Sequence, residues 1–313
     1  MSVLACPYFH SEEAAFRHLE SVLWTNGPVC PHCGMVSDKH YDLAKTRLGL
    51  RKCCAKECRK QFTVRVGTVF ESSHIPLHKT LQAVYLMTAS KKGISAHQLH
   101  RTLEITYKAA WFLAHRIREA MTETDPEPLG GAGKTVEVDE TFIGKPESVY
   151  VSGKGWQAKD RNGSTKSKVL TMVERGGRAI SVKVDDLTIP TIKRVLGEHV
   201  VLDSTLNTDE ARHYKQPGAA FEGHDAVNHS SYEYSRKEGE RLVTTNTVEG
   251  FFGIFKRGMK GVYQHCGEQH LHRYLAEFDF RYSNRIALGT DDKQRALKAM
   301  EGVSGKRLLY RAT

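Results

Sequence analysis

The chain has 313 residues, with 46 Lys and Arg against 36 Asp and Glu and a formal net charge of +10 at pH 7. This excess of positive charge favours a polyanionic partner such as nucleic acid. Hydrophobic residues make up 40% of the chain, which excludes a largely disordered protein and predicts packed cores. The length suggests about two domains of the usual ~100–200 residues each.

The sequence carries no membrane or secretion signal that we can identify. Its longest apolar runs, near residues 81–87 and 109–114, are far shorter than the ~18 residues of a spanning helix. The first sixteen residues lack the basic and apolar regions of a secretion signal. We therefore expect a cytoplasmic protein without a membrane partner, whose seven cysteines are not assumed to form disulfides.

Most of the cysteines lie in two groups near the N-terminus. Cys30-Pro-His-Cys33 is a CxxC turn, and Cys53, Cys54 and Cys58 follow about twenty residues later. Such pairs are typical of a zinc ribbon, in which four thiolates bind one structural Zn²⁺. We predict Cys30, Cys33, Cys53 and Cys58 as the ligands. Cys54 remains an alternative to Cys53, because both are spaced more widely from Cys58 than in a CxxC pair. The competing interpretation is that these cysteines are free thiols or form a disulfide.

A helical pattern follows the cysteines over residues 78–121. Ser95 and Thr106 are suited to cap the second and third of three helices, which together predict a segment that resembles a helix-turn-helix DNA reader. The third helix carries Lys108, Arg116 and Arg118 outside its apolar face, and we predict that they contact DNA. The alternative is a helical subdomain whose basic residues are only solvated.

The second half has the alternation of strands and helices expected of an α/β domain. Residues 135–143 alternate as a strand, residues 168–174 and 179–184 form a hairpin, and Thr188 caps a helix that runs to about Leu196. Residues 200–206 form a further strand. The predicted organisation is a zinc ribbon with an N-terminal helix (1–74), the helical segment (75–124), a linker rich in proline and glycine (125–134), a catalytic domain (135–290) and a C-terminal tail (291–313).

Acidic residues occur at three places in this domain. Asp139 lies on the first strand beside Glu137 and Glu140, Asp209 follows the strand at 200–206, and Glu249 lies on a helix that begins near Asn246. Hard oxygen ligands on separate elements can hold two divalent cations, which is what phosphodiester transfer requires.

The sequence as a whole resembles a known family of proteins. Over about residues 9–288 it is similar to zinc-ribbon insertion-sequence transposases of the DDE type. The stretches that carry the resemblance are Cys30-Pro-His-Cys-Gly, Cys58-Arg-Lys-Gln-Phe, Gly67-Thr-Val-Phe, Lys92-Gly-Ile-Ser-Ala, Ala110-Trp-Phe, His115-Arg-Ile-Arg, Val138-Asp-Glu-Thr-Phe-Ile-Gly, Val227-Asn-His-Ser, Asn246-Thr-Val-Glu-Gly-Phe-Phe and Phe280-Arg-Tyr-Ser-Asn-Arg.

The resemblance implies an RNase H-like α/β fold with a mixed sheet, Asp139 on its first strand and Asp209 just after its fourth. It implies a transposase that binds the terminal inverted repeats of its own element and cuts and joins DNA with two Mg²⁺ ions, for which Mn²⁺ can substitute. The implied partners are the element ends, the target DNA and further copies of the chain in a DNA-bound oligomer. The implied location is the bacterial cytoplasm, at the nucleoid.

The third acidic position has two candidates, because relatives of this type end the triad with either Asn or Glu. Glu249 and Lys256 are seven residues apart, so they share one helix face, and Gly253 between them leaves that face open to DNA. We therefore favour Glu249 as the ligand and Lys256 as a phosphate contact. Alternatively, Asn246 caps the helix and Glu249 closes a capping box.

Two further choices concern Asp203 and Trp156. Asp203 lies within the predicted strand, whereas ligands usually follow the carboxyl ends of strands, so we prefer Asp209. Trp156 lies in a basic loop, residues 145–168, and is our candidate for stacking on an exposed base.

Two other functions compete with a transposase. A catalytically inactive, domesticated DNA-binding protein would use the same modules, but the presence of all three carboxylates argues against it. A zinc hydrolase ranks last, because four thiolates leave zinc no open coordination position.

Overall fold

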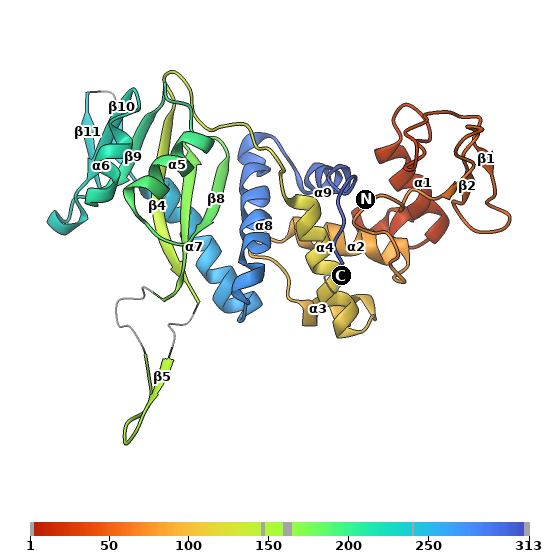
Figure 1. Ribbon diagram of the computed structural model, residues 1–313, viewed down its shortest axis with the longest axis horizontal. Helices are drawn as coiled ribbons and strands as arrows, with labels where there is room; N and C mark the ends of the chain where they lie inside the picture. Colours follow the sequence, from red (N-terminus) through yellow and green to blue (C-terminus); the bar gives the residue numbers. More distant parts are fainter. Residues whose placement is uncertain (1–2, 145–147, 159–164, 240, 310–313) are drawn as a thin grey trace. The chain divides into compact units, whose positions relative to one another are not determined.

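A computed structural model of the protein describes residues 3–144, 148–158, 165–239 and 241–309. The chain divides into two compact units, which are described separately (Figure 1): residues 1–122 with 290–313, and residues 123–289. Within the described residues, no helix combines the length and the apolar character needed to cross a membrane.

The first unit begins with a helix and a small antiparallel sheet. After the short 3₁₀ turns η1 (Val3–Ala5) and η2 (Pro7–Phe9) comes α1 (Glu12–Leu23), which Ser11 caps. Strands β1 (Tyr41–Asp42), β2 (Arg51–Lys52) and β3 (Gln61–Phe62) pair in that order. The described residues form a small buried cluster here, made of Cys30, Cys53 and Phe62, with Trp24, Ala55, Cys58 and Val66 partly buried against it. A core this small agrees with a module that needs a metal to fold.

Helices make up the rest of the first unit: α2 (Leu77–Ala89), α3 (Ala96–Leu103) and α4 (Tyr107–Met121). The predicted caps are confirmed, because Ser95 Oγ accepts from the Gln98 N–H at 3.1 Å and Thr106 Oγ1 from the Ala109 N–H at 3.2 Å. The segment 291–313, expected as a tail, contains α9 (Asp292–Glu301), which packs against α1, α2 and α4.

The second unit is built on a five-stranded mixed sheet of order β10-β9-β4-β7-β8. Its strands are β4 (Thr135–Ile143), β7 (Ser167–Glu174), β8 (Ala179–Val184), β9 (Thr205–Asp209) and β10 (Gly223–Val227). β7 runs antiparallel to both β4 and β8, whereas β9 runs parallel to both β4 and β10. The predicted hairpin and the mixed α/β sheet are confirmed.

Helices cover both faces of this sheet (Figure 1). On one face lie α5 (Ile189–His199) and α6 (Arg212–Gly218), packed on Val136, Val138 and Leu206. On the other lie α7 (Asn246–Gly258) and α8 (Leu271–Ser283), packed on Val169 and Val173. Because strand residues alternate between faces, Glu137 and Asp139 point toward α7 and Glu140 points toward α6.

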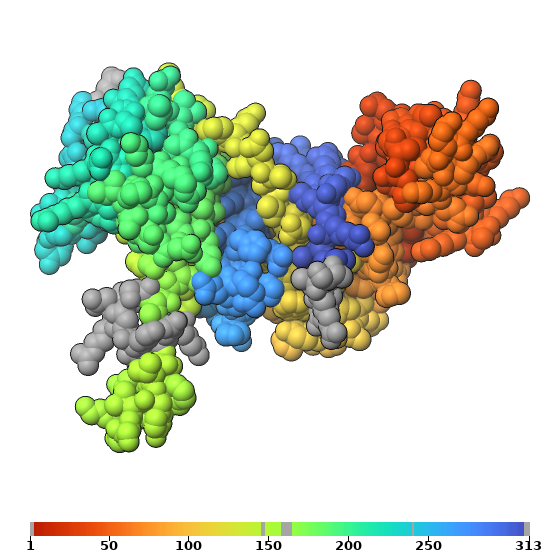
Figure 2. All heavy atoms as spheres, in the orientation of Figure 1, coloured from red at the N-terminus to blue at the C-terminus, as the bar shows by residue number. Residues whose placement is uncertain are grey.

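Smaller elements complete the unit: the hairpin β5 (Ser148–Val151)–β6 (Gly155–Ala158), the hairpin β11 (Ser235–Glu238)–β12 (Arg241–Thr244), the 3₁₀ turns η3 (His229–Ser231), η5 (Glu268–His270) and η6 (Ile286–Leu288), and the π-turn η4 (Met259–Tyr263). In Figure 2 the β5–β6 hairpin is a small lobe set apart from the sheet. Parts of the predicted basic loop 145–168, including Lys159 and Arg161, lie outside the described residues.

One predicted strand is wrong. Residues 201–204 form a turn, and the strand is β9, which starts at Thr205 and ends at Asp209. The apolar run at residues 200–202 misleads, because Val200 is buried in a single bridge to Leu129 while Leu202 is 54% exposed. Asp203 therefore precedes the strand, and Asp209 is its last residue and not the one after it.

Candidate active site and zinc site

The four predicted zinc ligands lie together in the first unit. The sulfur atoms of Cys30, Cys33, Cys53 and Cys58 all lie within 4.8 Å of one another. The Cys30–Cys58 sulfur distance is 3.7 Å and the Cys33–Cys53 distance is 3.6 Å. Zn–S bonds of ~2.3 Å in a tetrahedron require sulfur atoms ~3.8 Å apart. The cluster therefore fits one Zn²⁺ ion.

Cys54, the alternative to Cys53, is not in this cluster. Its backbone N–H donates to Nδ1 of the buried His40 at 3.2 Å. The His40 ring packs edge-on against Phe62, with centroids 5.2 Å apart. The backbone beside Cys53 is thus fixed in a way that directs Cys53, and not its neighbour, to the other three thiols.

The second unit brings the first two carboxylates onto adjacent strands. β4 and β9 pair in parallel, with Glu137 beside Asn207, so Asp139 and Asp209 follow two residues later on the neighbouring strands. Burial, as the main cause, and the charges of Glu140, Asp209 and Glu249 together raise the pKa of Asp139 to about 7. A cluster of uncompensated carboxylates is a donor set that suits divalent cations.

These carboxylates are less tightly gathered than the thiols. Among the described residues, the four cysteines are the only group of three or more Cys, His, Asp or Glu side chains gathered closely enough to hold a metal ion. Asp209 and Glu249 nevertheless lie near enough to Asp139 for their charges to contribute to its raised pKa.

The helix α7 supplies the third carboxylate. It begins at Asn246 with Thr245 as its N-cap, so Glu249 is the fourth helical residue. The Thr245 hydroxyl donates to Glu249 Oε1 at 2.9 Å, and His229 Nε2 lies 3.5 Å from the same oxygen. The alternative of a capping box at Asn246 is therefore wrong, because the helix starts one residue earlier than that box requires.

Both sites lie within stretches of the chain that match families of known proteins. Residues 128–283 match the ISXO2-like transposase domain family, and residues 10–61 match the transposase zinc-ribbon domain family. The chain belongs to the transposases that combine these two domains. It is also 27% identical over 288 residues to a Halobacterium salinarum protein described as an uncharacterized protein in transposable element ISH50, covering 87% of this chain and 91% of that one.

The exposed face of α7 is open in this transposase. A Cβ added at Gly250 would meet nothing within 4 Å, and one at Gly253 would meet only the Arg257 guanidinium at 3.6 Å. Lys256 is exposed on this helix, its Nζ 5.5 Å from the centroid of the Phe252 ring. A DNA strand can therefore approach the helix without a steric obstacle from these positions.

Glu140 lies on the far face of β4, as expected. It accepts a hydrogen bond from the Tyr214 hydroxyl at 2.5 Å, and His213 Nε2 lies 3.6 Å away. Tyr214 is 1% exposed; burial, followed by the charge of Glu140, raises the pKa of its hydroxyl well above the usual value. Glu140 thus ties β4 to α6.

Sequence reasoning missed the role of the residue after Asp209. Glu210 accepts from the N–H of His229 at 3.0 Å and from the N–H and hydroxyl of Ser230 at 3.1 and 2.5 Å. These bonds, led by the Ser230 hydroxyl, lower the pKa of Glu210 to about 2. They fix the loop that brings His229 to Glu249. The one sequence feature that could have indicated this role is that a second acidic residue directly follows Asp209.

The two neighbouring histidines have different surroundings. His224 Nε2 lies 2.9 Å from the Thr208 hydroxyl, and its ring packs so closely on Gly218 that a Cβ there would meet Nδ1 at 2.3 Å. Burial lowers the pKa of His224. His224 therefore serves packing, whereas His229 faces the carboxylate.

The predicted DNA contacts differ in exposure. Lys108 is exposed, but Arg116 and Arg118 are 8% and 2% exposed. The Arg116 guanidinium lies 4.6 Å from the centroid of the Phe112 ring, and burial lowers its pKa. We correct the prediction for these two arginines, because a buried guanidinium is not available to a phosphate in this conformation.

Trp156 is 71% exposed, with its ring centroid 5.8 Å from that of Tyr150.

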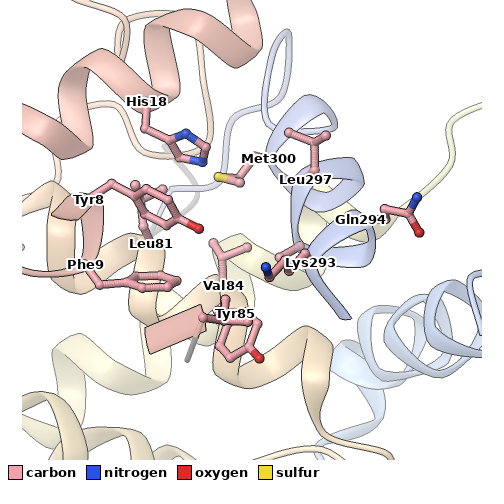
Figure 3. Close-up of a pocket in the computed structure, with 12 residues that line it drawn as sticks. Tyr8, Phe9, His18, Leu81, Val84, Tyr85, Lys293, Gln294, Leu297 and Met300 are labelled. Atoms are coloured by element: carbon pink, nitrogen blue, oxygen red, sulfur yellow. The ribbon is translucent and has the colours of Figure 1, made fainter. Parts of the chain in front are cut away.

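A cavity of about 210 Å³ lies in the first unit (Figure 3). It is lined mainly by apolar residues of the N-terminal segment, α2 and α9, and His18 of α1 also lines it. It contains none of the predicted catalytic or zinc-binding residues, so we assign the candidate chemistry to the two clusters above.

Proposed function

We propose that this protein is the transposase of its own insertion sequence, which binds the element's terminal inverted repeats and catalyses metal-dependent strand cleavage and strand transfer. The observation that carries the proposal is the approach of Asp139, Asp209 and Glu249 from two parallel strands and a helix. These residues lie within the part of the chain that matches a transposase domain family.

Asp139, Asp209 and Glu249 are the residues proposed to hold two Mg²⁺ ions, or Mn²⁺ in their place. Bound in this way, the ions would supply Lewis-acid activation of a water or 3′-hydroxyl and of the leaving oxygen. The pKa of about 7 at Asp139 supports this assignment, because a positive charge is needed to keep that buried carboxylate ionised at neutral pH. Thr245 and His229 orient Glu249 through the contacts described above.

The remaining parts are proposed to bind DNA. The zinc ribbon (1–74) and the helical segment (75–124) would bind the element ends, with Lys108 on a phosphate, and the linker (125–134) would join them to the catalytic domain (135–290). Lys256 is proposed as a phosphate contact beside Glu249 and Trp156 as a stacking residue. Because two ends must be joined, the active assembly is proposed to be a homo-oligomer on nucleoid DNA.

Incubation of the purified protein with DNA fragments that carry the element's ends tests this proposal. We expect nicked and joined products with Mg²⁺ or Mn²⁺ and none with EDTA. If the protein binds the ends but yields no product with either ion, it is a DNA-binding protein without catalysis, which is the alternative function.

A further inference from the structure

The acidic residue Glu137 lies on β4 close to the proposed ligand Asp139, but its side chain is buried. Glu137 is two residues before Asp139, on the same face of the strand, and its side chain is 0% exposed. A buried carboxylate is costly unless its oxygens are hydrogen-bonded and its charge is balanced.

The first turn of α7 supplies hydrogen-bond donors to this carboxylate. Glu137 Oε2 accepts from the N–H groups of Thr247 at 2.7 Å and Val248 at 3.1 Å, and Oε1 accepts from the Thr247 hydroxyl at 2.8 Å. The N-cap of α7, Thr245, makes no side-chain cap bond to that turn. Glu137 therefore caps this helix from another element, where a negative charge is also favoured by the helix dipole.

Arg175 balances the charge of Glu137 and extends the connection. Its Nε and Nη2 donate to Glu137 Oε1 at 3.0 and 2.8 Å. Its Nη1 donates to the Leu242 carbonyl at 2.7 Å and its Nη2 to the Thr244 carbonyl at 3.3 Å. Arg175 thus holds the strand that leads into α7, while Glu137 holds the first turn of the helix.

We propose that Glu137, with Arg175, is a positioning residue that sets the distance between Asp139 and Glu249 and thereby the affinity of the site for divalent ions. Glu137 is separated from Asp139 by one residue, and the N–H groups that it accepts precede Glu249 by one and two residues. The connection between strand and helix is thus made beside both proposed ligands. Because its oxygens already accept these five bonds, Glu137 is not itself a ligand.

This inference rests on the proposed function, and its test measures metal binding as well as activity. The variant Glu137→Gln keeps the side-chain size but removes the charge and turns one acceptor into a donor that faces N–H groups. We expect its Mn²⁺ dissociation constant and its Mn²⁺ concentration for half-maximal cleavage to rise by ~10-fold or more, the usual effect of removing a residue that orients metal ligands.

Asp279→Asn is the matched control. Asp279 is half-buried, and it ties α8 to β8 by accepting from the N–H and hydroxyl of Ser181 at 2.8 and 2.7 Å. It has no contact with α7 among those that fix Glu249. We expect this variant to alter thermal stability but to leave the Mn²⁺ dissociation constant at the wild-type value.

The outcomes separate the inference from the proposed function. If the wild type neither binds Mn²⁺ at this site nor cleaves, both fail. If it binds and cleaves but Glu137→Gln has the same Mn²⁺ dependence, the positioning role is overturned and the proposed function stands. If Glu137→Gln does not fold, Arg175→Lys replaces it, and an unchanged Mn²⁺ affinity in that folded variant overturns the inference.

Discussion

At the scale of single residues, the choice between Cys53 and Cys54 is decided by the backbone. Cys53 Sγ lies 3.6 Å from Cys33 Sγ, whereas Cys54 is outside the cluster. We expect Cys53→Ser to lose most of its bound zinc and to melt at a lower temperature, because metal binding contributes folding free energy to a module with a small core. Cys54→Ser should retain one zinc per chain. Zinc content measured by atomic absorption distinguishes them, and equal zinc in both variants would contradict the assignment.

The third ligand gives a second prediction at this scale. Glu249→Gln should lower cleavage by at least a hundredfold, since a ligand contributes more than the ~10–100-fold of a residue that only orients one. Asn246→Ala should have a smaller effect, because the side chain that Thr245 and His229 contact and whose charge acts on Asp139 is that of Glu249. Cleavage of end-bearing DNA at saturating Mn²⁺ measures both, with equal DNA binding as the control. The reverse order would make Asn246 the ligand.

Residue type and spacing are enough to predict that the four cysteines lie together and that Asp139 lies on the first strand of the sheet, because each motif is local. The role of Glu137 is not predictable in this way, since its partners Thr247 and Val248 are more than a hundred residues away in sequence. The prediction that Arg116 and Arg118 are exposed to DNA is wrong for a different reason. Helical periodicity finds the face that packs on one neighbour, but α4 contacts α2, α3 and α9.

At the scale of elements, α8 is joined to the sheet by a carboxylate with a raised pKa. Burial raises the pKa of Asp279 to about 7, although the bonds from Ser181 oppose this shift. The folded state therefore binds the proton more tightly than the unfolded state, whose pKa is near 3.8. The stability that this group contributes is complete below pH 4 and is lost as the pH rises toward 7.

Asp279→Asn should remove this pH dependence. The free energy of unfolding of wild type minus that of the variant should fall between pH 5 and pH 8. Urea unfolding of both proteins at the two pH values measures this difference. A difference that stays constant would show that Asp279 does not change its protonation in this range.

A second helix is capped from a distance, in the first unit. The Glu12 carboxylate accepts from the N–H groups of Leu77 at 2.8 Å and His78 at 3.1 Å, whereas the N-cap of α2, Pro76, offers no side-chain bond. Burial raises the pKa of Glu12, but these bonds outweigh it and lower the pKa. We expect Glu12→Ala to cost about 1 kcal/mol, as for loss of a helix cap.

Glu13→Ala is the matched control for Glu12→Ala. Glu13 pairs with Arg17 four residues later, at a side-chain exposure of 59%, and an exposed pair of this kind contributes ~0.3–0.5 kcal/mol. Urea unfolding of the two variants measures the difference. Equal losses would mean that Glu12 does not cap α2.

The success of the prediction at this scale depends on whether the signals are local. The starts of α3 and α4 are predicted because Ser95 and Thr106 act within their own turns. The strand β9 is misplaced because the apolar run before it is a turn. The helix α9 is missed, although Asp291 and Gln294 form a capping box, because its apolar positions are few.

At the scale of the whole molecule, the class of fold is predictable and its connections are not. The order of motifs and the resemblance predict a zinc ribbon, a helical segment and a mixed-sheet domain. The return of residues 290–313 to the first unit is not encoded in any local pattern. It depends on contacts such as that of the Arg295 guanidinium with the Thr88 carbonyl at 3.1 Å, between residues 207 positions apart.

The proposed function depends most directly on Asp139, as part of a metal-dependent centre that cuts and joins DNA. Asp139→Asn tests it most directly, with Asp203→Asn as the matched control, because Asp203 lies in an exposed turn before β9. We predict that the wild type and Asp203→Asn cleave and join end-bearing DNA with Mg²⁺ or Mn²⁺, while Asp139→Asn binds the same DNA without product. Product formation by Asp139→Asn at the wild-type rate would contradict the account.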